Sequence, residues 1–297
     1  MDTLTLTRDD KTLHLDARGH AEAPPILFLH GFPEYRAAWA PVAERLSDSY
    51  RCLMPDQRGY GLSWRGGAVA DYAVKHLAAD AIAMIDTFCG GRATVAGHDW
   101  GASVAYAVAM RAPERVSQLI IANGAHPVTF QRALAAGGAQ AQASSYIDWL
   151  RAPGSEEALA KDGFARMFGF FERHMNTDWL TPATRAAYAR AWRDAAGVGA
   201  MVNWYRATPL QVAKPGAPLD NADLPPWNPA ALRVSMAHLL LWGMQDKALL
   251  PEARAGLDAF CDDLTVKEHA QADHWIIHQE PDWVARHMRM WLAEKSA

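Results

Sequence analysis

Cysteine is scarce in this sequence, and its few positions carry no pattern. Among 297 residues there are three cysteines, Cys52, Cys89 and Cys261, which lie far apart and lack the spacing of metal ligands. An odd number of widely separated cysteines argues against a disulfide framework and against a zinc site. The sequence therefore predicts a protein of the reducing cytoplasm with no bound metal.

The chain also lacks an excess of basic residues and any long apolar run. Its formal net charge of -4 leaves no positive surface for a phosphate backbone, so nucleic-acid binding is not expected. The apolar run at 237–242 is far shorter than the roughly twenty residues of a membrane-spanning helix. Residues 1–17 alternate polar and apolar side chains, unlike a signal peptide. We expect neither a membrane span nor export by that route.

What the sequence does contain is an alternation of strand and helix patterns. Two alternating stretches and three short apolar runs are typical of strands, at 3–7, 13–17, 26–29, 94–96 and 119–122. Apolar residues recur at helical spacing between them, most clearly over 74–88. This alternation predicts an α/β fold in which helices cover both faces of a mostly parallel sheet.

The pattern changes in the middle of the chain. A long segment rich in Ala, Arg and Trp contains no convincing buried strand before 237–242, after which a strand at 264–268 and a helix at 281–292 are expected. This segment is predicted to be a helical cap inserted into the core. The predicted division is a first part of the core, the cap and a second part of the core, at 1–125, 126–232 and 233–297.

A nucleophile-elbow pattern follows one of the predicted buried strands. It reads Gly97-His98-Asp99-Trp100-Gly101 and precedes a helix of small residues. Flanking glycines permit a sharp strand-to-helix turn, which exposes the central side chain at the start of the helix. Asp99 is therefore the predicted nucleophile.

An aspartate at the centre of the elbow changes the chemistry that this site can perform. A carboxylate is already ionised at neutral pH, so it needs no activating base and can displace a leaving group from a saturated carbon. Against an ester or amide it would form a reactive anhydride, which disfavours esterases, lipases and peptidases. Epoxide opening and carbon–halogen displacement remain, and both would leave an alkyl ester on Asp99.

Hydrolysis of that ester requires a base that activates water. His274 follows the last predicted strand and is the strongest candidate among twelve histidines. Asp246, in the turn after the strand at 237–242, can orient the imidazole and stabilise its protonated form. The chain order of nucleophile, acid and histidine matches the hydrolase order. In some hydrolases the acid follows the sixth strand instead, but residues 121–124 carry no carboxylate.

Charge on the attacked ester also needs stabilisation. The segment 30–33 follows the predicted strand at 26–29, where such folds supply one oxyanion-hole amide. We predict that the backbone amides of Phe32 and Trp100 form the oxyanion hole. For His30 itself, a structural role is favoured over a catalytic one.

Four segments together resemble the epoxide-hydrolase branch of the α/β-hydrolases. They are HGFPE at 30–34, DQRGYGLS at 56–63, the elbow around Asp99, and His274-Trp275. The resemblance extends over nearly the whole chain and is least specific in the predicted cap. It implies an α/β-hydrolase fold, a small-molecule epoxide as substrate, no metal or organic cofactor, and a structural role for the 56–63 loop.

The resemblance also implies two ring-opening tyrosines in the cap. An epoxide oxygen leaves as a strongly basic alkoxide unless it receives a proton or a hydrogen bond. Tyr146 and Tyr205 have flanking residues that resemble the family's pair, whereas Tyr188, on an Arg- and Ala-rich helix, is expected to be exposed. Trp100 and Trp149, beside the nucleophile and a ring-opening tyrosine, are the predicted substrate contacts.

Two alternatives to an epoxide hydrolase share the same residues. A haloalkane or haloacetate dehalogenase would use the same nucleophile. Haloalkane dehalogenases commonly have Asn where this chain has Phe32, and fluoroacetate dehalogenases favour Arg where it has Trp100. A ligand-binding or signalling homologue with little turnover would keep the pocket, but every expected catalytic residue is present, which argues against it.

Overall fold

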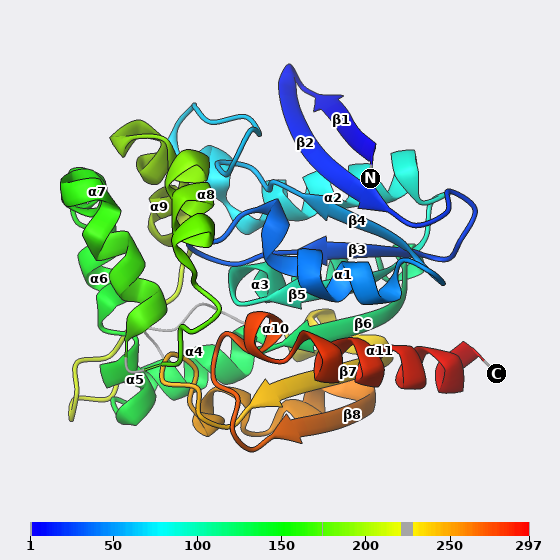
Figure 1. Cartoon of the computed structure of the whole chain (residues 1–297). Helices are drawn as coiled ribbons and strands as arrows, with labels where there is room; N and C mark the ends of the chain where they lie inside the picture. Colours follow the sequence, from blue (N-terminus) through cyan, green and yellow to red (C-terminus); the bar gives the residue numbers. More distant parts are fainter. Residues whose placement is uncertain (1, 174, 221–227, 297) are drawn as a thin grey trace.

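The computed structural model describes residues 2–173, 175–220 and 228–296, and in these ranges the strands form one eight-stranded sheet (Figure 1). The strands are β1 (Asp2–Arg8), β2 (Lys11–Arg18), β3 (Pro25–Leu29), β4 (Arg51–Pro55), β5 (Ala93–His98), β6 (Val116–Ala122), β7 (Val234–Gly243) and β8 (Cys261–His269). Their order across the sheet is β1-β2-β4-β3-β5-β6-β7-β8. The β1/β2 and β2/β4 pairs are antiparallel and the other neighbours are parallel, so the predicted fold class is confirmed.

Strand β4 is absent from the sequence prediction. It is a short segment that starts with the partly exposed Arg51 and ends in Pro55, so neither an alternating pattern nor a long apolar run reveals it. It becomes a strand because it pairs on both sides, antiparallel with β2 and parallel with β3, which buries Cys52 and Leu53. Tertiary pairing, not local propensity, makes this strand.

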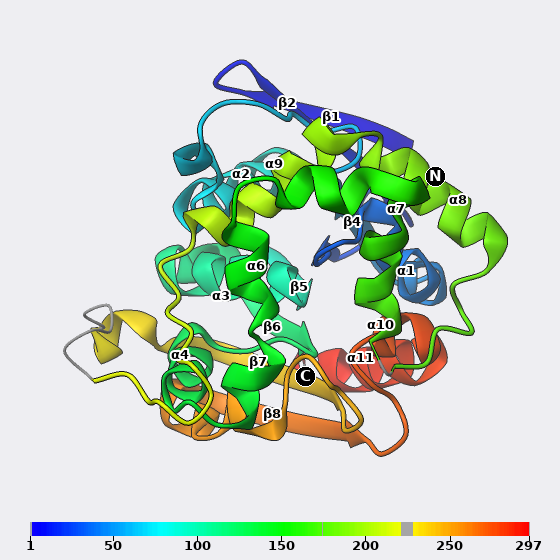
Figure 2. The same ribbon diagram turned by 90° about the vertical axis from the view of Figure 1, so that its left-hand side faces the viewer.

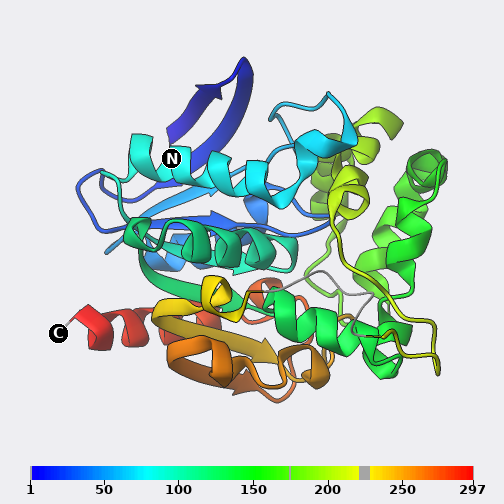
Figure 3. The ribbon, with the colours of Figure 1, turned by 180° about the vertical axis from the view of Figure 1, so that it is seen from behind.

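Helices cover both faces of the sheet (Figures 1 and 3). One face carries α1 (Ala40–Leu46), α10 (Ile276–Gln279) and α11 (Pro281–Ser296), and the other carries α2 (Val74–Phe88) and α3 (Trp100–Arg111). Helix α2 has the bounds that its apolar spacing predicts, because Leu77, Ala81 and Ile85 form its buried stripe. The sheet is thereby buried on both sides, as its continuous apolar strands require.

Between β6 and β7 the described part of the chain contains helices and no strand. They are α4 (Pro127–Ala135), α5 (Ala139–Ala143), α6 (Tyr146–Arg151), α7 (Ser155–Glu172), α8 (Pro182–Trp192) and α9 (Ala195–Ala207). Helices α6 to α9 lie over the carboxyl ends of the parallel strands (Figure 2). None of the helices in the described ranges is both long and apolar enough to cross a bilayer.

The prediction that Tyr188 is exposed is wrong. Its side chain on α8 is 2% exposed, and its ring contacts Tyr35, Phe171 and Trp192 at centroid distances of 5.1, 4.9 and 5.7 Å. The Arg and Ala residues of α8 that suggested exposure lie mainly on its solvent-facing side. The opposite face packs an aromatic cluster against the core, which composition alone does not reveal.

Candidate active site

Asp99 lies in a sharp turn between β5 and α3. Its φ of 51° and ψ of -120° are unusual for a residue with a side chain, and such strained backbone is typical of functional sites. The turn requires its glycines: a Cβ on Gly97 would lie 2.5 Å from the carbonyl oxygen of Gly101, and a Cβ on Gly101 would lie 2.1 Å from that of Leu29. The elbow thus presents Asp99 at the carboxyl edge of the sheet.

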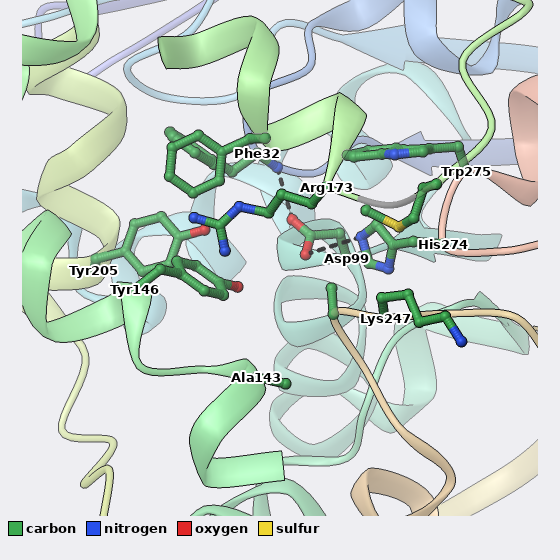
Figure 4. Close-up of a pocket in the computed structure, with 12 residues that line it drawn as sticks. Phe32, Asp99, Ala143, Tyr146, Arg173, Tyr205, Lys247, His274 and Trp275 are labelled. Carbon is green, nitrogen blue, oxygen red and sulfur yellow. Dashed lines mark hydrogen bonds and ion pairs between the residues drawn. The ribbon is translucent and has the colours of Figure 1, made fainter. Parts of the chain in front are cut away.

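The two carboxylate oxygens of Asp99 have different surroundings (Figure 4). The backbone amide of Phe32 donates a hydrogen bond to Oδ1 at 2.7 Å, whereas Oδ2 lies 3.5 Å from Nε2 of His274. The amide of Trp100, the other predicted oxyanion donor, is the first of α3 and has no partner within the helix. Among the described residues, a backbone amide donates to Oδ1 and none donates to Oδ2, so the two oxygens are not equivalent.

His274 and Asp246 meet beside Asp99, at the carboxyl ends of β8 and β7. Nδ1 of His274 donates to Oδ2 of Asp246 at 2.8 Å, so its Nε2 faces Asp99. Asn123, at the end of β6, donates its amide to the same Oδ2 at 2.7 Å, and two amides of the following turn donate to Oδ1 at 2.7 and 2.8 Å. These donors fix the orientation of the Asp246 carboxylate.

Neighbouring carboxylates keep His274 protonated while Asp99 is ionised. Burial disfavours the imidazolium, but the charge and hydrogen bond of Asp246, reinforced by Asp99, hold the pKa of His274 well above its usual value. Any reaction that makes Asp99 neutral removes one of these two negative charges and therefore lowers the pKa of His274. The imidazole is thus arranged to change from a cation into a base when Asp99 is modified.

A second charged cluster, which the sequence analysis does not identify, lies behind the elbow. The fully buried Glu34 accepts hydrogen bonds from the Gly31 amide and Nδ1 of His98 at 2.8 Å each, and from Nε2 of His278 at 2.7 Å. Burial acts to raise the pKa of Glu34, but His98 and His278 outweigh it and hold this pKa well below its usual value. Nε2 of His98 lies 2.8 Å from the carbonyl oxygen of His274. The cluster therefore ties together the segments that carry Phe32, Asp99 and His274.

Tyr146 of α6 and Tyr205 of α9 line the same cavity as Asp99. Their ring centroids are 6.1 Å apart, and the Phe32 ring lies edge-on to Tyr205 at 5.1 Å. Burial and then the charge of Asp99 raise the pKa of Tyr146, and burial, Tyr146 and Asp99 raise the pKa of Tyr205. Both phenols therefore keep their protons at neutral pH and can act as hydrogen-bond donors.

Two pockets, called lobes below, share Asp99, Tyr146 and Tyr205 as lining residues. One lobe is mainly apolar, and its walls include Trp100, Phe130, Ile147, Leu210 and Leu249. The walls of the other lobe include Phe32, Phe170, Arg173, Lys247, His274 and Trp275. Within the described residues, no group of three or more His, Cys, Asp or Glu side chains is arranged to hold a metal ion.

Of the two predicted substrate contacts, the structure brings only Trp100 to the cavity. Trp149 is not among the described residues that line either lobe; it is 38% exposed, and the guanidinium of Arg166 lies 5.9 Å from its ring. Helix α6 buries Ile147 and Leu150 instead, so Trp149 lies on the face that is turned outward. Proximity to Tyr146 in the sequence does not imply proximity in space.

The sequence model of the alpha/beta hydrolase fold family matches residues 24–281 of this chain. Among curated proteins, the AB hydrolase superfamily protein YfhM of Bacillus subtilis is 32% identical over 275 residues, which is 91% of this chain and 90% of the relative. Epoxide hydrolase 2 of Caenorhabditis elegans is 28% identical over 291 residues, which is 96% of this chain and 78% of the relative. Both similarities extend over the core and the inserted helices alike.

A solved structure is similar over almost its full length. It belongs to a study of epoxide hydrolases of the alpha/beta hydrolase superfamily in metagenomes from hot environments, and it superimposes with a TM-score of 0.89 at 32% identity. The match covers 98% of each chain. The similarity therefore includes the helices above the sheet as well as the sheet itself.

Proposed function

The chain belongs to the alpha/beta hydrolase fold family, and we propose that it hydrolyses a small-molecule epoxide to a vicinal diol through a covalent ester on Asp99. The observation that carries this proposal is the surroundings of the nucleophile. Within the described ranges, no backbone amide donates to Oδ2 of Asp99, and Asp99 lines a cavity together with two protonated phenols, Tyr146 and Tyr205. The similarity to epoxide hydrolases supports the same function.

In the first step, Tyr146 and Tyr205 hold the epoxide oxygen while Oδ2 of Asp99 attacks a ring carbon. The bond between that carbon and the epoxide oxygen breaks, and an ester to Asp99 forms. The developing alkoxide takes a proton from a phenol, and the resulting phenolate takes the proton of His274. Step one therefore ends with a neutral ester and a neutral imidazole. His274 can lose its proton at this point because the ester no longer carries the negative charge of Asp99, which helped to raise the pKa of His274.

In the second step, Nε2 of His274 removes a proton from water, and the water oxygen attacks the acyl carbon of the ester. Negative charge develops on Oδ1, where the Phe32 amide already donates a hydrogen bond and the Trp100 amide is available. The acyl bond to Oδ2 then breaks, and the diol leaves with that oxygen. Proton transfer to the diol and back to His274 restores the ionised Asp99 and the imidazolium.

The helices above the sheet act as a cap in this proposal. Residues 126–232 contribute the two phenols, and residues 1–125 and 233–297 contribute the nucleophile, the base and the acid. Substrate is then held between the two parts, and a closed cap excludes bulk water from the ester.

A dehalogenase is the nearest competing function. Phe32 has no side-chain donor for a departing halide, and a halide is a weak base that leaves without the proton that an alkoxide takes from a phenol. The test is a panel of alkyl and aryl epoxides assayed beside haloalkanes and fluoroacetate, with diol and halide measured separately. Diol formation supports the proposal. Halide release without diol would replace it with a dehalogenase, and tight epoxide binding without turnover would replace it with a ligand-binding protein.

The two phenols are expected to accelerate ester formation. Removing one hydroxyl group, by Tyr146→Phe or Tyr205→Phe, should slow this step, and removing both should slow it by about 10²- to 10⁴-fold, because the rings remain but no acid reaches the alkoxide. Rapid-quench measurement of the first turnover reports this rate. Tyr50→Phe, a half-buried tyrosine packed on the other side of the sheet, is the matched control. A double variant that forms ester at the parental rate would remove both tyrosines from the mechanism.

A further inference from the structure

Arg173 places a positive charge in the cavity that the proposed mechanism does not use. It follows α7, and its side chain extends toward Tyr146 and Tyr205 (Figure 4). Its guanidinium carbon lies over two aromatic rings, 4.6 Å from the centroid of Tyr146 and 4.3 Å from that of Phe170. Among the described residues, no carboxylate forms an ion pair with it.

In the part of the chain that the structure describes, no group accepts a hydrogen bond from Arg173, so its N–H groups are available. A guanidinium presents these donors in a fork that matches a carboxylate. The ammonium of Lys247, which also lines this lobe, points away from Asp99 (Figure 4). Besides the imidazolium of His274, Arg173 is therefore the cation directed into the site.

The charges already in the site explain why such a cation matters. Asp99 and Asp246 contribute two carboxylates, against one imidazolium on His274. A substrate that carries its own negative charge would be repelled by the nucleophile unless a fixed cation compensated that charge. Arg173 is exposed and has no carboxylate partner among the described residues, so it can supply that compensation.

We propose that the substrate is an epoxy carboxylic acid, whose carboxylate binds Arg173 and whose apolar substituent occupies the lobe of Trp100 and Phe130. This inference rests on the proposed epoxide hydrolase function and names its substrate class. The guanidinium lies over the ring of Tyr146, whose hydroxyl holds the epoxide oxygen in the proposed mechanism. The carboxylate is therefore separated from the oxirane by a few bonds at most, as in a glycidic acid with an aryl or alkyl group on the other ring carbon.

The test compares trans-3-phenylglycidate with its primary amide, which has nearly the same shape and no charge. The parental protein is expected to prefer the acid. In Arg173→Gln, the ratio of kcat/KM for acid to that for amide should fall by about ten- to a hundredfold, mainly through KM of the acid, since that is the size of a hydrogen bond to a charged group. Arg173→Lys, which keeps the charge without the fork, should retain part of the preference.

Arg166→Gln is the matched control, because it removes the same charge from the same region of the cap at an exposed arginine outside the cavity. Its ratio of acid to amide should equal the parental one. Equal losses for acid and amide in Arg173→Gln would mean that Arg173 acts on the tyrosines and would overturn the inference, as would a parental protein that does not prefer the acid. If neither glycidate, amide nor simple epoxides yield diol, the proposed function itself fails.

Discussion

A His274→Gln protein is expected to accumulate a covalent ester on Asp99. The substitution removes the base that activates water but leaves the ionised nucleophile and both phenols in position, so alkylation continues while hydrolysis slows by about 10²- to 10⁴-fold. Intact-protein mass spectrometry after incubation with a reactive epoxide should show one added substrate mass. Peptide mapping should place that mass on the segment that contains Asp99.

This result would separate the proposed mechanism from that of a serine hydrolase. There the histidine must activate the nucleophile, so its loss suppresses the first step as well. His20→Gln, the same substitution at an exposed loop position, is the control and should accumulate no adduct. A folded His274→Gln protein that binds epoxide but never gains the added mass, or gains it on another residue, contradicts the assignment.

Replacing Asp99 with alanine is expected to reduce diol formation by roughly 10⁴- to 10⁶-fold, the scale seen when a hydrolase loses its nucleophile. The fold should survive, because the turn is determined by its glycines and by the start of α3, and because aspartate already places a Cβ at the positive φ of 51°. Circular dichroism and thermal denaturation check folding, and product analysis checks turnover. Near-parental diol formation by the folded variant would rule out the covalent ester.

Oxygen isotopes make the same test on the parental protein. In a single turnover in ¹⁸O-water with enzyme in excess, the diol should carry unlabelled oxygen from Asp99, and the label should appear in the Asp99 carboxylate. Direct attack of water on the epoxide would label the diol instead. For the Asp99→Ala variant, the matched control is Asp258→Ala, which removes an exposed carboxylate from the short helix η7 (Leu257–Phe260) before β8. It should leave turnover unchanged.

The sequence by itself determined the features that depend on local sterics and on pattern. Continuous apolar runs predicted most of the buried parallel strands, and helical spacing predicted α2 to the residue. Asp99 could be identified because its elbow depends on glycines within two residues of it. The chemistry proposed for it follows from the carboxylate, so that proposal needs only the sequence.

Tertiary structure decided which distant side chains meet. Asn123 supports Asp246 because β6 and β7 are neighbours in the sheet. Glu34 contacts both His98, 64 positions away, and His278, 244 positions away. Tyr188 turned inward, against its expected exposure, because helix packing and not composition selects the face that is buried. Trp149 turned outward for the same reason.

Tertiary structure also decided the position of Arg173 over Tyr146. Nothing in the residues that flank it distinguishes it from the other arginines of the middle segment, such as Arg166, and its meaning comes from the cavity that it enters. Short-range rules set strands, turns and the nucleophile because each depends on a few adjacent residues. Which distant side chains contact one another depends on how whole helices and strands pack. The charge proposed for the substrate could therefore be inferred only after the helices were placed above the sheet.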